Sequence, residues 1–359
     1  MRTMRFRVIL AFAAIALVGV AGLRVYAQET PNGGEPGYPG PMKIVYPPGT
    51  ISIVHVQNNV YLVAGAGGNI TMQLGSDPLW GQDGVLLIDT GEADTAKKVY
   101  DAIQTMTKKP IRYIINTDSA ADHVGGNAIL APLGETIAGG NVVGAIGASA
   151  ANQAAVLAYE NVLDRMSAPT GKTAAYPEVA WPTETYTTDE RKLFFNGDDI
   201  EMLHVPNATT DGSTIVVFRR SDVISAGDIF NSNEYPRIDV DKGGSIQGVL
   251  DGLNLMMKIA IPQNLQEGGT MIVPGHGRIC DVADLAFYQE MVTIIRNRIQ
   301  YYIGQGMTLD QVKAAKPTLD YDGEYGRSSG PWTTDMFIDA IYKSLSAAKA
   351  GKTATPAGH

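Results

Sequence analysis

The first half of the chain alternates short apolar runs with glycine, asparagine and aspartate, a pattern typical of strands joined by turns. Before the last of these runs, residues 92–106 carry apolar side chains at helical spacing, and Pro110 follows them. A strand, a helix and another strand in succession predict a crossover that packs on one face of a sheet. The expected strands lie at residues 51–56, 60–64, 70–74, 85–88 and 111–115.

The second half repeats this order of elements. A helix at 246–259 precedes the last of its strands, and two more helices follow at 282–303 and 334–348. Two sheets with helices on their outer faces predict an α/β (α+β) fold, a four-layer αββα sandwich. The expected strands are 192–195, 199–204, 213–218, 223–226 and 270–273.

An Ala/Gly/Asn-rich stretch at residues 138–158 separates the two halves and has only weak periodicity. We expect an insertion there that forms a loop or a loose helix over one edge of the fold. Its composition indicates no chemistry of its own.

The N-terminus differs in kind from the rest of the chain. Three arginines lie among the first seven residues, an apolar run covers residues 8–23, and small residues precede Ala27. This pattern predicts a signal peptide at residues 1–27 and a periplasmic or secreted protein. The alternative is a retained membrane anchor, since the run is close to the shortest that spans a bilayer.

The remaining boundaries follow from composition. Residues 28–49 are rich in proline and glycine and are expected to form a linker, because they can hold neither a helix nor a sheet ladder. Residues 50–348 are expected to form the folded domain, and 349–359 a flexible tail.

Composition narrows the class of protein. With 359 residues, 45% of them hydrophobic and 18% charged, the chain is able to bury a full core. Its net charge of −9 disfavours nucleic acid as a partner and leaves a small-molecule substrate, with a membrane involved only if the N-terminal segment is uncleaved. Cys280 is the only cysteine, so no intrachain disulfide forms and we expect a buried, apolar role for this residue.

Two of the five histidines lie in loops just past expected strands, where sheet scaffolds place their sites. His123 belongs to Asn-Thr-x-x-x-x-Asp-His-x-Gly-Gly-Asn at residues 116–127, and His276 to Pro-Gly-His-Gly at 274–277. The first segment is similar to the HxHxDH loop of the metallo-β-lactamase superfamily. Further matches follow in the family's order: Asp89-Thr90-Gly91, residues 158–163, residues 226–230 and Gly243-Gly244-Ser245.

These matches cover about residues 50 to 345, and the chain resembles a metallo-β-lactamase-fold metallohydrolase. The family holds its first metal with three histidines. The corresponding positions here are Asp118, Ala120 and Thr209, so the resemblance implies that the first site is degenerate.

The resemblance implies that the second metal site is retained. Its ligands in the family match Asp122, His123 and His276, with Asp228 in the place of the bridging aspartate. Asp89 matches a buried aspartate that braces the metal loop without touching the metal. In the alternative reading, Asp122 and Asp228 persist only as hydrogen-bond acceptors that brace their loops.

Two nitrogen and two carboxylate ligands suit one zinc ion. Asp118 would add a third carboxylate and make manganese or iron possible, or it would serve as a base that orients water, and both roles stay open. Four protein ligands also close a tetrahedral zinc, so catalysis, in which Asp122 would take part, requires a fifth position or the release of one carboxylate.

Two functions follow from these residues. The first is an exported hydrolase that uses one metal to activate water against an ester, amide, lactam or related bond. The alternative is a non-catalytic binding protein on the same scaffold, whose metal is structural or absent.

Overall fold

The computed structural model describes residues 46–75, 83–136, 153–263, 265 and 268–353. The expected signal peptide and most of the expected linker lie outside these ranges, so both stay predictions. None of the helices in the described ranges is long and apolar enough to cross a membrane.

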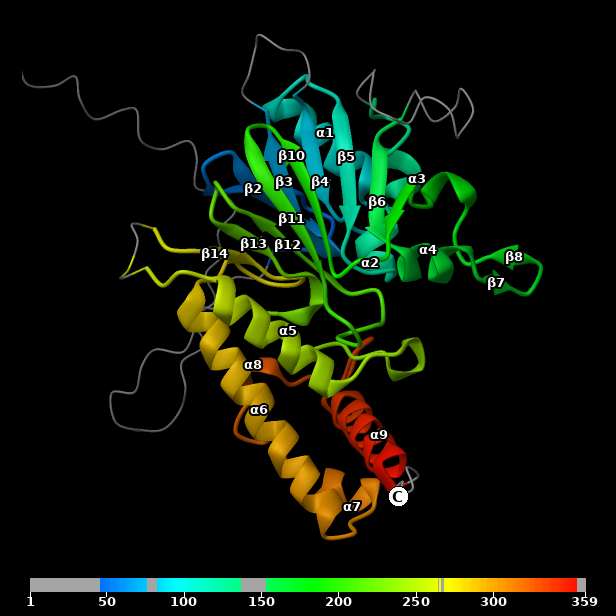
Figure 1. Ribbon diagram of the computed structural model, residues 1–359, viewed down its shortest axis with the longest axis vertical. Helices are drawn as coiled ribbons and strands as arrows, with labels where there is room; N and C mark the ends of the chain where they lie inside the picture. The colour runs from blue at the N-terminus through cyan, green and yellow to red at the C-terminus, as the bar shows by residue number, and fades with distance from the viewer. Residues whose placement is uncertain (1–45, 76–82, 137–152, 264, 266–267, 354–359) are drawn as a thin grey trace, which may run out of the picture. The chain divides into compact units, whose positions relative to one another are not determined.

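The first sheet has seven strands, in the order β1-β2-β3-β4-β5-β6-β9 (Figure 1). Strands β1 to β4 pair in antiparallel fashion, whereas β4, β5, β6 and β9 run parallel. Helix α1 (Ala96–Met106) makes the crossover from β4 to β5. The strands are β1 (Ser52–Gln57), β2 (Val60–Ala66), β3 (Gly68–Leu74), β4 (Val85–Ile88), β5 (Ile111–Asn116), β6 (Ala155–Tyr159) and β9 (Glu184–Tyr186).

The second sheet has five strands, in the order β10-β11-β12-β13-β14. Its first four strands are antiparallel, and α5 (Ile246–Ile259) then leads to β14, which pairs in parallel with β13. This is the same succession as in the first sheet. The strands are β10 (Glu190–Phe195), β11 (Asp198–His204), β12 (Thr214–Phe218), β13 (Val223–Ser225) and β14 (Met271–Val273).

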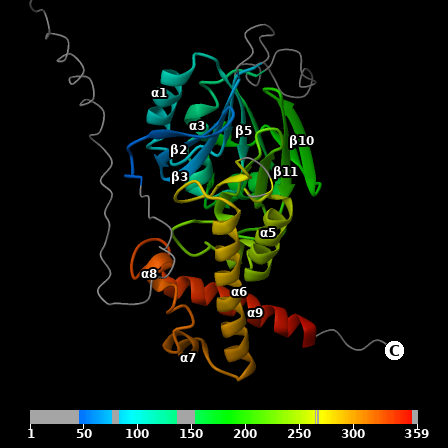
Figure 2. The same ribbon diagram turned by 90° about the vertical axis from the view of Figure 1, so that its left-hand side faces the viewer.

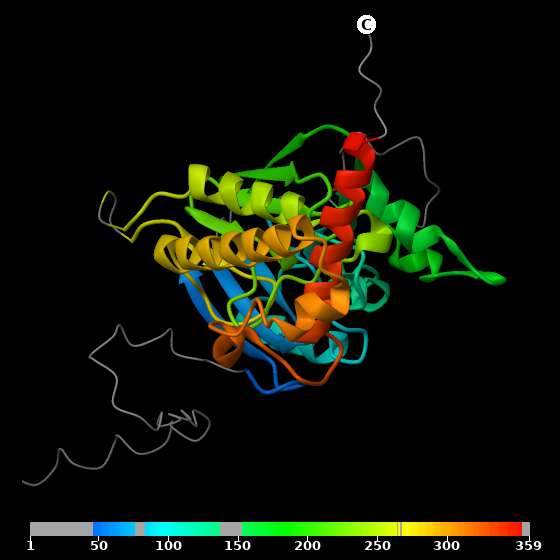
Figure 3. The ribbon, with the colours of Figure 1, turned by 90° about the horizontal axis from the view of Figure 1, so that it is seen from below.

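Three buried apolar clusters define four layers. One joins α1 and α3 (Asn127–Leu130) to the outer face of the first sheet, and one fills the space between the sheets. The third joins the second sheet to α5, α6 (Val282–Gly304) and α9 (Thr334–Thr353). Figures 2 and 3 show α5 and α6 side by side with α9 crossing them. The expected αββα sandwich is confirmed.

An insertion was expected at residues 138–158, and this prediction is wrong for the last residues of that range. Residues 137–152 lie outside the described part of the chain, but Ala155–Tyr159 form β6, which lies between β5 and β9. A parallel strand covered on both faces lacks the polar alternation that marks a half-exposed strand. Ala155 and Ala158 were therefore read as part of the alanine-rich stretch before them.

The C-terminal helix is anchored to the segment that follows β13. The ring of Phe337 stacks on that of Tyr235, with 4.6 Å between centroids and 7° between planes, and both side chains are buried. Helix α9 also packs on α5, α6 and the short 3₁₀ helix η4 (Val240–Lys242). One face of α9 therefore belongs to the core.

We expect Phe337→Ala to lower the free energy of unfolding by about 3–5 kcal/mol, because it removes a buried aromatic ring and leaves a cavity. Chemical denaturation followed by circular dichroism measures this value. Met336→Ala is the control on the same helix, since Met336 is 41% exposed. Equal stability of the two variants would contradict this account of the anchor.

Candidate metal centre

The polar residues singled out by the motifs come from the carboxyl ends of two parallel strand pairs. Asp89 follows β4, and α2 (Ala121–Val124) follows β5. On the other sheet, the 3₁₀ helix η3 (Gly227–Ile229) follows β13, and His276 follows β14. Parallel strands that end together bring their loops to one edge, where α/β folds place ligands.

Asp122, His123, Asp228 and His276 converge at this edge, and each offers a ligand atom within 4.8 Å of the others. His276 Nε2 lies 3.1 Å from Asp122 Oδ2 and 3.4 Å from Asp228 Oδ1, and His123 Nε2 lies 3.3 Å from Asp228 Oδ2. A tetrahedral zinc with bonds of about 2.0–2.1 Å separates its ligand atoms by about 3.4 Å. The spacing of the four residues therefore suits one small cation.

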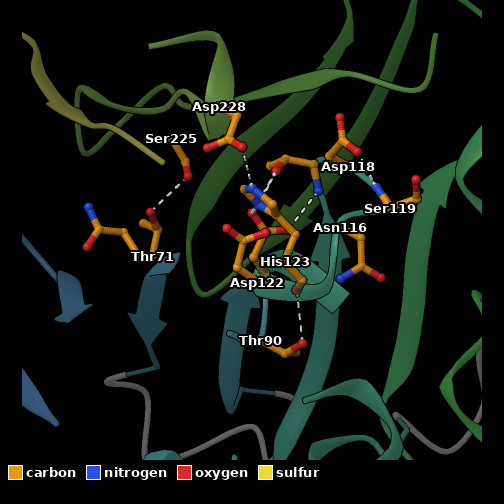
Figure 4. Close-up of polar contacts among 12 residues, drawn as sticks. Thr71, Thr90, Asn116, Asp118, Ser119, Asp122, His123, Ser225 and Asp228 are labelled. Atoms are coloured by element: carbon orange, nitrogen blue, oxygen red, sulfur yellow. Dashed lines mark hydrogen bonds and ion pairs between the residues drawn. The ribbon is translucent and has the colours of Figure 1, made fainter. Parts of the chain in front are cut away.

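Two atoms of this group are buried and lack a hydrogen bond to any described residue: His123 Nε2 and Asp228 Oδ1. Their nearest charged partners, Asp228 Oδ2 for the first and His276 Nε2 for the second, lie 3.3 and 3.4 Å away, so a cation between these groups would complete their contacts. Gly275 lets the backbone before His276 approach Asp228 closely, because a Cβ on this residue would lie 2.4 Å from Asp228 Oδ1. The donor set fits a metal ion, and Figure 4 shows Asp122, His123 and Asp228 together.

Asp89 holds His123 in place from behind. Its Oδ2 lies 2.7 Å from His123 Nδ1 and accepts from Thr117 Oγ1 at 2.6 Å, while Oδ1 accepts from the Thr117 amide at 2.8 Å. Because Nδ1 contacts Asp89, Nε2 on the other side of the ring faces Asp228. Asp89 itself lies outside that group and adopts a left-handed backbone conformation with φ of 65°.

The electrostatics of the site favour positive charge at its centre. Burial alone would lower the pKa of His123, but the charges of Asp89 and Asp228 raise it well above its usual value. Burial would raise the pKa of Asp228, yet the charges of His123 and His276 hold it below its ordinary range. The pocket that attracts a proton in this way is equally suited to a metal cation.

Arg237 is a part of the site that sequence reasoning missed. Its Nη1 donates to Asp122 Oδ2 at 2.7 Å, and its Nε donates to Glu234 at 2.7 Å. The pKa of Asp122, which burial would raise, falls far below its usual range because of the His276 hydrogen bond and the nearby positive charges, Arg237 among them. No motif marks Arg237, since only the tertiary fold brings it to Asp122.

The degenerate first site contains a hydrogen-bonded cluster around Asp118. Its Oδ2 accepts from the hydroxyls of Thr210 at 2.8 Å, Thr209 at 3.2 Å and Ser213 at 3.4 Å, and its Oδ1 accepts from the Ser119 amide at 2.5 Å. Burial raises the pKa of Asp118. Three of these contacts share Oδ2, so Oδ1 keeps an acceptor position besides the one that the Ser119 amide uses.

A cleft of about 460 Å³ opens beside these residues. Asp118, Ala120 and Thr209, the three positions of the missing histidines, line it together with Asp228 and Arg237. The remaining walls come from the segment around η4 and from the C-terminal helix. Of the four converging residues, Asp228 lines the cleft, which therefore borders both the cluster around Asp118 and one side of the group of four.

A model of the metallo-beta-lactamase superfamily matches residues 79–276, more than half of the chain and all four converging residues. The chain belongs to the metallo-beta-lactamase superfamily. Solved structures of this fold agree with the assignment. The chain is similar to the stereoselective inverting sec-alkylsulfatase from Pseudomonas sp., with 17% identity and a TM-score of 0.55.

That match covers 82% of this chain and 50% of the alkylsulfatase, so the chain spans about half the length of the alkylsulfatase structure. A metallo-beta-lactamase from Pontibacter korlensis matches with 15% identity and a TM-score of 0.48, covering 68% of this chain and 99% of that one. A search of curated proteins found no match. At these identities the structures show the shared fold alone.

We expect Asp118→Ala to lower the free energy of unfolding by about 1–3 kcal/mol, because buried donors would lose their acceptor. Asp118→Asn is the matched control: it keeps the size and one acceptor oxygen, and it removes a buried charge. Thermal and urea unfolding of both variants test this difference. An alanine variant as stable as the asparagine variant would show that the cluster does not depend on its acceptor.

Proposed function

We propose that this chain is a hydrolase that works with a single metal ion held by Asp122, His123, Asp228 and His276. The family is one of metal-dependent hydrolases, and the four residues form a candidate site. The observation that carries the proposal is the pair of buried, unsatisfied atoms, His123 Nε2 and Asp228 Oδ1, within the converging group. Zinc suits this donor set, with manganese or iron as alternatives.

A cation bound there would supply Lewis acidity for the attack of water on a carbonyl or phosphoryl centre. The chain's own residues prepare that attack. Asp89 fixes the ring of His123, and Arg237 and His276 fix Asp122 through its Oδ2. Asp122 Oδ1 has no hydrogen bond to the described residues, which leaves it as an acceptor for a water beside the metal.

Asp118 lies beside this group of four. Its Oδ2 carries the three hydroxyl contacts, whereas Oδ1 accepts only from the Ser119 amide, so a third carboxylate ligand and a base that orients water both stay open as its role. A single metal is proposed because the positions that match the first site hold no histidine. Zinc is favoured over a harder metal when only the two carboxylates of the group of four bind it.

One observation favours the second candidate, a binding protein without catalysis. Arg237 and His276 both contact Asp122 Oδ2, so this oxygen has its hydrogen bonds without a metal. In that case the four residues brace the loops around the cleft, and the cleft only holds a ligand.

Metal content tests the proposal directly. We expect purified protein incubated with zinc, manganese or iron and then dialysed to retain about one metal per chain by elemental analysis, because one complete donor set is present. His276→Ala should lose most of it. His204→Ala is the matched control, since His204 lies on β11 and stacks on Tyr159 outside the group of four. Protein that retains none of these metals rules the proposal out.

Activity separates the two candidates. We expect hydrolysis in a panel of ester, lactam, thioester and phosphodiester substrates, and Asp122→Ala should reduce it by about a hundredfold or more, since even outer partners of metal ligands contribute about 10–100-fold. Activity that Asp122→Ala abolishes excludes the binding protein. A loaded protein that hydrolyses none of these substrates favours it.

A further inference from the structure

Arg237 lies beside the positions that match the ligands of the family's first metal. Asp118, Ala120 and Thr209 line the cleft at these positions, and Arg237 lines it with them. It also donates to Asp122 Oδ2 at 2.7 Å, so it contacts the group of four. The other cations of the described lining, both lysines, make no ion pair with that group. One positively charged side chain therefore borders both the first-site positions and the candidate metal ligands.

The guanidinium of Arg237 is fixed in place and permanently charged. Its Nε donates to Glu234 Oε1 at 2.7 Å. The backbone carbonyl of Glu234 in turn accepts from the buried hydroxyl of Tyr288 at 3.1 Å. Burial would lower the pKa of Arg237, but the nearby carboxylates, Asp228 first among them, raise it. A charge that is held in place before the reaction stabilises a transition state without reorganisation.

Part of the guanidinium remains available to a ligand. Nε and Nη1 are engaged by Glu234 and Asp122, whereas Nη2 has no hydrogen bond to any described residue. Nη2 is also not among the enclosed atoms of the described residues that lack a partner, and the Arg237 side chain is 27% exposed. Nη2 is therefore accessible from the cleft that Arg237 lines, and an oxygen of a ligand can accept from it.

Hydrolysis of the proposed kind creates negative charge on the substrate. When water adds to a carbonyl carbon, a new C–O bond forms, the electron pair of the C=O bond moves onto its oxygen, and the water proton passes to solvent. In two-metal sites, the two ions share the stabilisation of the attacking and the leaving oxygen. With a single metal ion, the place of the second positive group is open to an arginine.

We propose that Arg237 takes over the electrostatic part of the lost first metal: it donates from Nη2 to the substrate oxygen that becomes negatively charged as water adds. This inference rests on the proposed hydrolase function and adds a catalytic residue to it, beyond the contact by which Arg237 fixes Asp122. The alternative, in which Arg237 only braces Asp122, predicts an effect on metal binding alone.

The first experiment measures hydrolysis of p-nitrophenyl acetate and bis(p-nitrophenyl) phosphate with zinc in excess, so that a weakened metal site is still filled. We expect Arg237→Gln to lower kcat by about a hundredfold, the effect of removing one donor to an oxyanion, and to leave KM nearly unchanged. Arg237→Lys keeps the charge but not the planar fork, so its kcat should fall between the two. Arg298→Gln is the matched control, because Arg298 also pairs with one carboxylate, Asp320, and lies outside the described lining of the cleft.

The second experiment measures binding without turnover. Inorganic phosphate, a tetrahedral anion, is titrated into the zinc-loaded full chain by isothermal calorimetry, with the zinc content of each variant checked by elemental analysis. We expect Arg237→Gln to weaken phosphate binding about tenfold or more, because a charge-assisted hydrogen bond is lost. Arg298→Gln should bind phosphate as the wild type does. Circular dichroism checks that each variant is folded.

The outcomes separate this inference from the proposed function. Hydrolysis with equal kcat in Arg237→Gln and the wild type overturns the inference and leaves the hydrolase standing. Phosphate binding that is absent, or that does not depend on Arg237, also overturns the inference. So does a loss of activity that excess zinc restores, since Arg237 then acts only through the metal site. Phosphate binding that depends on Arg237 without hydrolysis of either ester refutes the hydrolase and leaves Arg237 as the anion-binding group of a ligand site.

Discussion

The contact between Asp89 and His123 underlies the whole site. It joins the loop after β4 to the loop after β5, and both side chains are fully enclosed. Burial makes the pairing strong, because an isolated charge there would be costly. The same contact determines which nitrogen of His123 faces Asp228. Hydrogen bonds from Thr90 to the His123 carbonyl and between Asn127 and Asn116 then hold the rest of the 116–127 loop.

The group of four and the cluster around Asp118 differ in whether their polar atoms already have hydrogen-bond partners. On one side, side chains with unsatisfied atoms face a common point, and these atoms attract positive charge. On the other, the hydroxyls of Thr209, Thr210 and Ser213 surround one oxygen of the Asp118 carboxylate. A compact polar cluster therefore stands in the place of the first-site histidines and borders the cleft.

Much of this centre could be predicted from the sequence, because short loops at strand ends carry their chemistry in consecutive residues. Asp122 and His123 are adjacent, and the structure brings both to Asp228 and His276 as expected. Arg237 could not be predicted, since its position depends on how the segment after β13 folds over Asp122. Strand β6 was misread because burial on both faces removes the alternation that reveals a strand. The role of α9 in the cleft follows from helix packing, which sequence periodicity does not specify.

Helix α9 packs into the core with one face and lines the cleft with another. Phe337 is fixed against Tyr235, while Met336 and Lys343 project from the side that lines the cleft. Substitutions on the exposed side leave the anchoring contacts intact, so they change what the cleft accepts at little expense to folding. A replacement at Met336 or Lys343 therefore changes the wall of the cleft and leaves the ring contact of Phe337 with Tyr235 in place.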